Sequence, residues 1–275
     1  MPEGPEIRRA AEQVAAAVAG RTAIRVLFTL PRLGPHGPRL SGRRVEAVES
    51  RGKALLVHFA GGDSIYTHNQ LYGRWYVVAP GRPPATGREL RLAIHTRSKW
   101  ALLYSASDIA VLPRARLGEH RYLARLGVEL LKRGTRLRTV RAALDAPRFA
   151  RRSLAALLLD QSFLAGIGNY LRSEILFAAR LAPHSRLATL SPGDRDRLAS
   201  AALALTRRAY RTGGITNDPA RAARLKRQGL PFAAYRHQVF GRDGQSCWQC
   251  GTAITREQAA GRNLYACPRC QRRHD

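Results

Sequence analysis

The 275-residue chain carries 47 lysines and arginines against 19 aspartates and glutamates, a net charge of +28 at neutral pH. So large a positive charge attracts polyanions, so nucleic acid is the first candidate partner and an anionic membrane surface is the second. No apolar run approaches the roughly 20 residues needed to span a bilayer, and the N-terminus lacks the basic-then-apolar order of a signal peptide. We therefore expect a cytoplasmic protein without membrane segments, whose four cysteines are not structural disulfides.

The N-terminal residues combine a potential amine nucleophile with nearby carboxylates. Removal of Met1 would leave Pro2 as a secondary amine, whose pKa of about 8 keeps more of it unprotonated near neutrality than a lysine with a pKa of about 10.4. Such an amine can attack a sugar carbon and collapse to an iminium ion, which is Schiff-base chemistry. The same stretch also suits an ordinary helix start, with Pro5 in the first turn and Glu3 and Glu6 favourable to the helix dipole.

A helix and then many short strands are predicted for the first part of the chain. Apolar residues at helical spacing indicate an amphipathic helix over residues 5–19. Alternating or apolar segments predict strands near residues 24–30, 53–59, 63–68, 73–78, 90–94 and 99–105. This density of short strands favours an antiparallel sandwich or barrel.

After about residue 113 the pattern becomes helical. Helices are predicted near residues 115–126, 136–144, 153–163 and 169–180. A further helix should begin after Ser191, with Pro192 at its first position and Asp194 at its third. Residues 212–234 contain glycines, prolines and several bases, and predict a long mobile loop.

Composition therefore divides the chain into four parts of an α+β protein. We expect a β-sandwich domain with a leading helix over residues 1–130, a basic inter-domain linker over 131–152, a helical domain over 153–236 and a cysteine module over 237–275. The linker assignment depends on the eight bases and one acid between residues 132 and 152.

The cysteine module has the spacing of a metal site. Sixteen residues separate two C-x2-C pairs, which are Cys247 with Cys250 and Cys267 with Cys270. This spacing matches a four-cysteine zinc site on a β-ribbon, with iron in a rubredoxin-like pair of knuckles as the alternative. Four protein ligands leave no open position for water, which predicts a structural role. The intervening hairpin carries Arg256 and Arg262, which are either phosphate ligands or solvated surface charges.

A glycine-rich turn lies between two predicted helices. An apolar helix should end at Gly166, turn through Gly168 and restart at Asn169. Free N–H groups at a helix N-terminus favour a phosphate, although an ordinary connector between helices fits the pattern equally well.

Four motifs occur in a fixed order: Pro2-Glu3-Gly4-Pro5-Glu6, Arg51-Gly52-Lys53, the turn over residues 164–170, and the four cysteines. Over essentially the whole chain they resemble the formamidopyrimidine-DNA glycosylase/endonuclease VIII family of base-excision repair enzymes. The contiguous Gln70-Leu71-Tyr72 segment is similar to the wedge loop of the bacterial endonuclease VIII branch rather than to the purine-directed branch. The resemblance implies a helix–two-turn–helix in the helical domain and one structural zinc ion.

The resemblance also implies a reaction. A bifunctional enzyme of this kind removes oxidised pyrimidines from damaged double-stranded DNA through a Schiff base and cuts the strand by β,δ-elimination. Pro2 would be the nucleophile, Glu3 the acid and Glu6 its support, while Lys53 and Arg262 would bind phosphates and assist the eliminations. No redox or nucleotide cofactor is required, and we expect a monomer.

Further residues would contact the DNA. Leu71 and Tyr72 would fill the space of the extruded nucleotide and Gln70 would bind the orphaned partner base, whereas a packed hairpin core is the alternative reading of the two apolar side chains. Arg125 and Asn169 match DNA-contacting positions of the family. Two other functions stay open, which are the same chemistry on oxidised purines and a non-catalytic zinc-ribbon DNA-binding protein.

Overall fold

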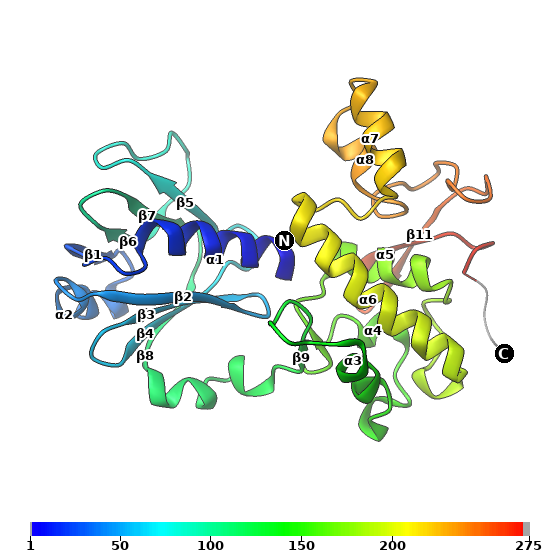
Figure 1. Ribbon diagram of the computed structural model, residues 1–275, viewed down its shortest axis with the longest axis horizontal. Coiled ribbons are helices and arrows are strands. Elements are labelled where there is room, and N and C mark those ends of the chain that lie inside the picture. The colour runs from blue at the N-terminus through cyan, green and yellow to red at the C-terminus, as the bar shows by residue number, and fades with distance from the viewer. Residues whose placement is uncertain (1, 272–275) are drawn as a thin grey trace. The chain divides into compact units, whose positions relative to one another are not determined.

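The computed structural model describes residues 2–271, and the chain forms two compact units (Figure 1). One unit comprises Pro2 and Glu6–Arg125, and the other comprises Glu3–Pro5 and the chain from Leu126 onward. The division therefore falls before Leu126 rather than after residue 130, and Glu3 is grouped with the second unit although it lies at the N-terminus.

The first unit is a sandwich of two four-stranded antiparallel sheets with helix α1, Gly4–Val18, beside them. One sheet has the order β1 (Arg25–Phe28), β6 (Leu90–His95), β7 (Trp100–Tyr104), β5 (Arg74–Val78). The other has the order β2 (Val45–Arg51), β3 (Ala54–Phe59), β4 (Asp63–His68), β8 (Asp108–Pro113). The short helices η1 (Pro31–Leu33) and α2 (His36–Leu40) follow β1. The predicted antiparallel sandwich is confirmed.

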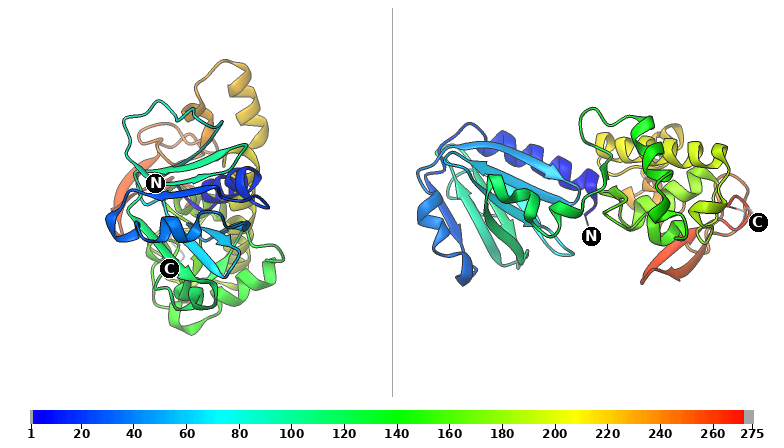
Figure 2. Two further views of the ribbon diagram at one scale, coloured as in Figure 1. Left: turned by 90° about the vertical axis from the view of Figure 1, so that its left-hand side faces the viewer. Right: turned by 90° about the horizontal axis from the view of Figure 1, so that it is seen from below.

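An apolar core shared by helix α1 and both sheets explains why these elements pack together. The helical stripe of α1 is buried, including Ile7, Val14 and Val18, and it shares one cluster with Leu92 of one sheet and Leu55 of the other. Figure 2 shows α1 running along the strands. Burial of each such side chain contributes about 1.5–3 kcal/mol, so the alternation along the strands decides which face turns inward.

Two strands of this unit, β2 and β8, were not predicted from the sequence. The pairing of β2 with β3 shifts register between Val45 and Ala47, which breaks the period of two that identifies a strand. The helix predicted over residues 115–126 is also wrong. That segment forms two 3-10 helices, η2 (Arg114–Glu119) and η3 (Leu123–Arg125), because only Leu123 among their residues is buried and no helical apolar face exists.

The second unit is a helical bundle joined to a small hairpin. Its helices are α3 (Leu137–Leu144), α4 (Leu154–Leu157), α5 (Asn169–Ala179), α6 (Pro192–Thr212), α7 (Pro219–Arg227) and α8 (Phe232–Arg236), with 3-10 turns η4 (Pro147–Phe149) and η5 (Leu187–Thr189). Strands β9 (Val128–Glu129) and β10 (Leu164–Ala165) pair in parallel, and β11 (Thr255–Ala259) and β12 (Arg262–Ala266) pair antiparallel. Helix α6 begins at the predicted cap, where Ser191 and Asp194 form a capping box.

Three expectations for this unit need correction. Residues 131–152 are not a linker, because α3 lies within them and buries Val140 and Leu144 in the core of the unit. The helix predicted over residues 153–163 is confined to α4, and the chain then turns into β10. The predicted loop over residues 212–234 contains α7 and most of α8, because Asp218 caps a helix that buries Ala222 and Leu225.

Candidate active site and zinc centre

The carboxylate of Glu3 lies in a cage of backbone N–H groups at the start of α5. Its two oxygens accept hydrogen bonds from the backbone N–H groups of Gly168 at 2.7 Å, Tyr170 at 2.8 Å and Leu171 at 3.3 Å. The side chain is 3% exposed. Glu3 therefore takes the anion position at the helix N-terminus, where the sequence suggested a phosphate.

Glycine is required at this turn by the close approach of Glu3. A Cβ built on Gly168 would lie 2.4 Å from the carboxyl carbon of Glu3, a distance that no relaxed structure tolerates. On the other side of the turn, Gly4 N–H donates to the Gly166 carbonyl at 2.8 Å, and Gly166 has a φ of 97°. The Gly-x-Gly spacing of the sequence thus serves to hold the residue that follows Pro2.

The amide of Gln161 fixes the same turn from inside. Its Oε1 accepts the Gly166 N–H at 3.0 Å, and its Nε2 donates to the carbonyls of Leu159 at 2.9 Å and Ile167 at 3.0 Å. The backbone that holds Glu3 is therefore preorganised by partly buried hydrogen bonds within the protein rather than by a ligand.

Asn169 joins the start of α5 to the β11–β12 hairpin. Its Nδ2 donates to the Asn263 carbonyl at 2.8 Å, and its Oδ1 accepts from Arg172 Nη2 at 2.8 Å. These bonds fix the orientation of the amide and leave one Nδ2 hydrogen for a further acceptor. Arg262 is exposed and opens β12, after a two-residue turn at Ala260 and Gly261, which both have positive φ.

Arg172 is a residue that the sequence analysis did not single out. Its guanidinium is fully buried and donates to the carbonyls of Ala259 at 2.9 Å and Asn263 at 3.1 Å, so that it ties α5 to the hairpin. Burial, with the nearby charge of Arg262, lowers its pKa to about 10. The available signal was a charged residue inside the apolar pattern of residues 169–180, which requires internal partners.

Glu174 is a second buried charged residue of α5 that the sequence analysis did not single out. It is fully buried and accepts the backbone N–H groups of Gln238 at 2.9 Å, Val239 at 2.8 Å and Phe240 at 3.0 Å, together with the Thr216 hydroxyl at 2.6 Å. Helix α5 thus carries a buried carboxylate that anchors the chain segment entering the cysteine module.

Lys53 lies in the first unit, in the two-residue turn that joins β2 to β3. Gly52 has a φ of 58° and permits the turn. Lys53 is 7% exposed, and its backbone N–H donates to the Tyr122 hydroxyl at 2.8 Å. The Tyr122 ring meets the His68 ring at 5.3 Å, and burial lowers the pKa of His68, with the Lys53 charge acting in the same direction.

The loop between β4 and β5 presents the predicted wedge residues to solvent. Leu71 is 52% exposed and Tyr72 is 66% exposed, so the packed-core reading of these side chains is wrong. Gln70 adopts a left-handed conformation with a φ of 51°, and its side-chain Oε1 accepts from the Ser107 hydroxyl at 2.9 Å.

The base of this loop is closed by a tight backbone contact. Gly73 N–H donates to the Asn69 carbonyl at 2.7 Å, and a Cβ on Gly73 would lie 2.5 Å from that oxygen. The apolar tip is therefore carried on a rigid base, which is the arrangement expected of a probe that inserts between bases.

The two units divide the predicted site residues between them. The first contains Pro2, Glu6, Lys53, Gln70, Leu71, Tyr72 and Arg125. The second contains Glu3, Asn169, Arg262 and the four cysteines. Pro2 and Glu6 are half-buried, and Arg125 is exposed at the end of η3.

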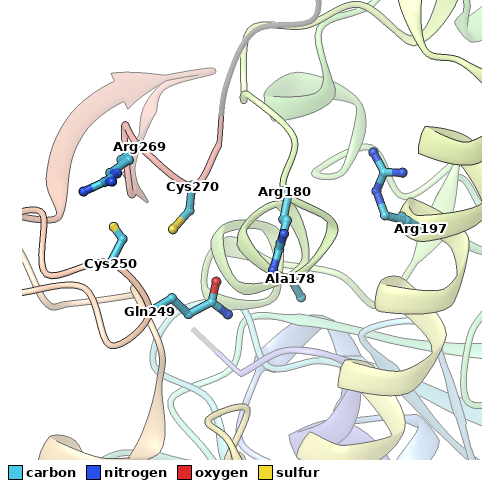
Figure 3. A pocket seen from close by; sticks show the side chains of 7 residues that line it. All are labelled: Ala178, Arg180, Arg197, Gln249, Cys250, Arg269 and Cys270. Carbon is cyan, nitrogen blue, oxygen red and sulfur yellow. The ribbon is translucent and has the colours of Figure 1, made fainter.

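The four cysteines form a metal site. Their sulfur atoms all lie within 4.8 Å of one another, with Cys247 Sγ 3.9 Å from Cys270 Sγ and Cys250 Sγ 3.4 Å from Cys267 Sγ. A tetrahedron with Zn–S bonds of about 2.3 Å requires sulfur separations of roughly 3.8 Å, so the cage fits zinc. Figure 3 shows Cys250 and Cys270 at the edge of a solvent-open pocket near Arg180 and Arg269.

The β11–β12 hairpin carries two arginines, Arg256 and Arg262. Arg256 on β11 lies 3.6 Å from Asp243, and both side chains are exposed. Arg262 stands opposite Ala259 at the turn end of β12.

Among residues 2–271, no helix is both long and apolar enough to cross a membrane.

Comparison with known proteins agrees with this architecture. Residues 1–107 match the formamidopyrimidine-DNA glycosylase N-terminal domain, residues 126–219 its H2TH domain, and residues 244–273 a zinc finger found in FPG and IleRS. Endonuclease 8 of Klebsiella pneumoniae subsp. pneumoniae is 45% identical over 271 residues, which cover 98% of this chain and 100% of the relative. Endonuclease 8 of Escherichia coli K12 is 44% identical over 98% of this chain and its own full length.

Solved structures show the same fold. The complex of wild-type Lactococcus lactis Fpg with DNA containing an oxidised pyrimidine superimposes with a TM-score of 0.81 at 20% identity, over 99% of this chain and 100% of that chain. The chain therefore belongs to the formamidopyrimidine-DNA glycosylase/endonuclease VIII family of bifunctional DNA glycosylases with AP lyase activity.

Proposed function

We propose that this protein excises oxidised pyrimidines from double-stranded DNA and cuts the strand by β,δ-elimination, with Pro2 as the nucleophile. The observation that carries the proposal is the N–H cage of Glu3, which fixes a carboxylate on the residue next to the candidate amine. Endonuclease 8 relatives at 44–45% identity support the pyrimidine preference.

The first step joins the Pro2 nitrogen to C1′ of the damaged nucleotide, and the bond from C1′ to the base breaks. The base leaves with the electron pair of that bond as an anion and takes up a proton from water. Three backbone N–H donors hold the Glu3 carboxylate in place, and Glu3 would begin the reaction as a proton acceptor. It would take the proton released as the amine forms its bond, and return that proton to the sugar ring oxygen as the ring opens to the iminium ion.

The iminium ion then drives strand cleavage. Loss of a proton from C2′ expels the 3′ phosphate, and a second elimination expels the 5′ phosphate, which leaves a one-nucleoside gap with phosphates at both ends. Lys53, Arg262 and the remaining Nδ2 hydrogen of Asn169 would hold the phosphates, and Arg172 would position the last two through the β11–β12 hairpin. Arg125 would add a further phosphate contact.

The damaged nucleotide must leave the base stack before its C1′ can be attacked. Leu71 and Tyr72 are exposed on a rigid loop and would occupy the vacated space, while Gln70 would bind the orphaned base. The enzyme would act as a monomer, because a single chain supplies every residue that the proposed reaction needs. Its DNA substrate would place it in the cytoplasm. Zinc would hold the hairpin that carries Arg262 and take no part in the chemistry.

Borohydride trapping tests the proposal directly. Reduction during incubation with a duplex containing thymine glycol should give a covalent adduct, and peptide mass spectrometry should locate it on the Pro2 nitrogen after loss of Met1. A Pro2→Gly variant should trap poorly, whereas Glu12→Gln, on the exposed face of α1, should trap normally. An adduct on a lysine, or active protein that retains Met1, would refute the nucleophile assignment. Faster release of 8-oxoguanine would refute the pyrimidine preference.

A further inference from the structure

Helix α7 is a basic helix that the proposed reaction does not use. Four of its nine residues are bases and none is an acid. The side chains of Arg224, Lys226 and Arg227 are exposed, and within residues 2–271 none of the three forms an ion pair. Figure 1 shows α7 and its neighbour α8 standing apart from helices α3 to α6.

The bases Arg224, Lys226 and Arg227 lie close together in the last turn of α7, where the helix dipole favours cations. Like charges three or four residues apart destabilise a helix by a few tenths of a kcal/mol per pair. Some helical arginines elsewhere in this chain have an acidic partner on their own helix, as in the Arg8–Glu12 pair of α1 and the Arg197–Asp194 pair of α6, whereas α7 contains no acid. The exposed bases of α7 therefore form a positively charged surface that attracts anions from outside the chain.

The opposite face of α7 is firmly attached to the zinc centre. Ala222 and Leu225 pack in one cluster with Trp248, which lies between the ligands Cys247 and Cys250. The Arg221 guanidinium lies 5.2 Å from the centroid of the Trp248 ring. The inward face is thereby fixed, and the exposed face presents Arg224 and Arg227 beside alanines, which allow another molecule to approach closely.

Helix α8 connects α7 to the N–H cage of Glu3 within the same unit. The Arg236 guanidinium lies 5.0 Å from the Tyr170 ring centroid and 5.4 Å from the Phe232 ring centroid. Tyr170 supplies one of the N–H groups that bind Glu3. The basic helix is therefore attached to the element that holds the candidate active site, and a long polyanion bound at that site is the ligand class that can also reach α7.

We propose that α7 is an additional binding surface for the phosphate backbone of duplex DNA, in which Arg224, Lys226 and Arg227 contact phosphates without reading sequence. This inference rests on the proposed function for its choice of polyanion. Helix α7 would raise the affinity for any duplex and would leave the chemical step unchanged.

The test compares a neutral variant with a charge-preserving one. R224Q/K226Q/R227Q should weaken binding of an undamaged duplex at 0.1 M salt about tenfold or more, and should lower the slope of log affinity against log salt by about two to three. R224K/R227K should keep the wild-type slope. Single-turnover strand cleavage of an abasic duplex at saturating enzyme should be unchanged in both variants.

Each outcome decides the question. An unchanged affinity and slope in the neutral variant, with helical content confirmed by circular dichroism, would overturn the proposal, and so would an equal loss in R224K/R227K. Retained DNA binding with lost binding to anionic vesicles would assign the helix to a membrane surface instead. The assay on undamaged DNA involves no catalysis, so it can succeed even if borohydride trapping fails and the proposed function is wrong.

Discussion

The wedge loop of the first unit and the start of α5 in the second unit present their candidate functional side chains in opposite ways. In the first, Leu71 and Tyr72 project into solvent from a loop whose base is locked at Gly73. In the second, Glu3 and Arg172 are buried and nearly every polar atom of each has a backbone partner. The side chains that we propose to enter DNA are exposed, whereas the proposed catalytic carboxylate and the arginine beside it are held in place by backbone partners.

The contrast also separates stability from function. Exposed apolar side chains contribute little to folding, so changes in the loop should affect activity alone. A buried carboxylate with three N–H donors contributes to both, because its removal leaves those donors without an acceptor. Four predictions follow from this difference, beginning with the largest expected effect.

Replacement of Glu3 by glutamine should produce the greatest loss. The E3Q side chain cannot accept a proton, and its amide places N–H donors against the backbone N–H groups of Gly168 or Tyr170. Excision of thymine glycol under single-turnover conditions should fall by about 10²–10⁴-fold, and unfolding free energy by about 1–3 kcal/mol. The control is E12Q, an acid of the exposed α1 pair. A Glu3→Gln enzyme with near-normal excision would contradict the assigned role.

Removal of zinc should affect the second unit and spare the first. The cysteines pack with Phe177, Val239 and Ile254, so loss of the metal opens a core as well as the hairpin. Chelation should abolish DNA binding, and hydrogen exchange should rise at Thr255–Ala266 while the strands of the sandwich stay protected. Persistent protection of β11 and β12 in protein shown by metal analysis to be zinc-free would contradict this prediction.

The wedge loop should show a smaller loss confined to activity. L71A and Y72A should each slow excision from a paired duplex by about tenfold, since base–aromatic stacking is worth about 1–3 kcal/mol. Their melting temperatures should match wild type, because both side chains are exposed. V77A, at another exposed apolar position on the following strand, is the matched control. An equal effect on a substrate with the lesion in single-stranded DNA would argue against a wedge, because no stack needs filling there.

Much of this organisation could be predicted from the sequence, and the failures have physical causes. The sandwich, the cysteine cage and the capping box at Ser191 depend on local spacing and are correctly predicted. Strand β2 was missed because a bulge interrupts its alternation. The N–H cage of Glu3 could not be foreseen, because it joins residues more than 160 positions apart. The burial of Arg172 and Glu174 likewise depends on partners from distant segments.

The smallest expected effect is a pH dependence confined to the second unit. Burial, reinforced by the Arg236 charge, lowers the pKa of His237 to about 3. Because the folded pKa lies below the unfolded value of about 6.5, only the unfolded chain binds the proton as pH falls between them. This stability is fully present above about pH 6.5 and declines toward pH 3, by at most about 1.4 kcal/mol per pH unit. Urea unfolding at pH 7.5 and 5.5 should therefore show a larger acid loss for wild type than for H237Q. An identical loss in both would place the acid sensitivity elsewhere, and the half-buried His95 of the β-sandwich, whose pKa burial also lowers, would be the next histidine to replace.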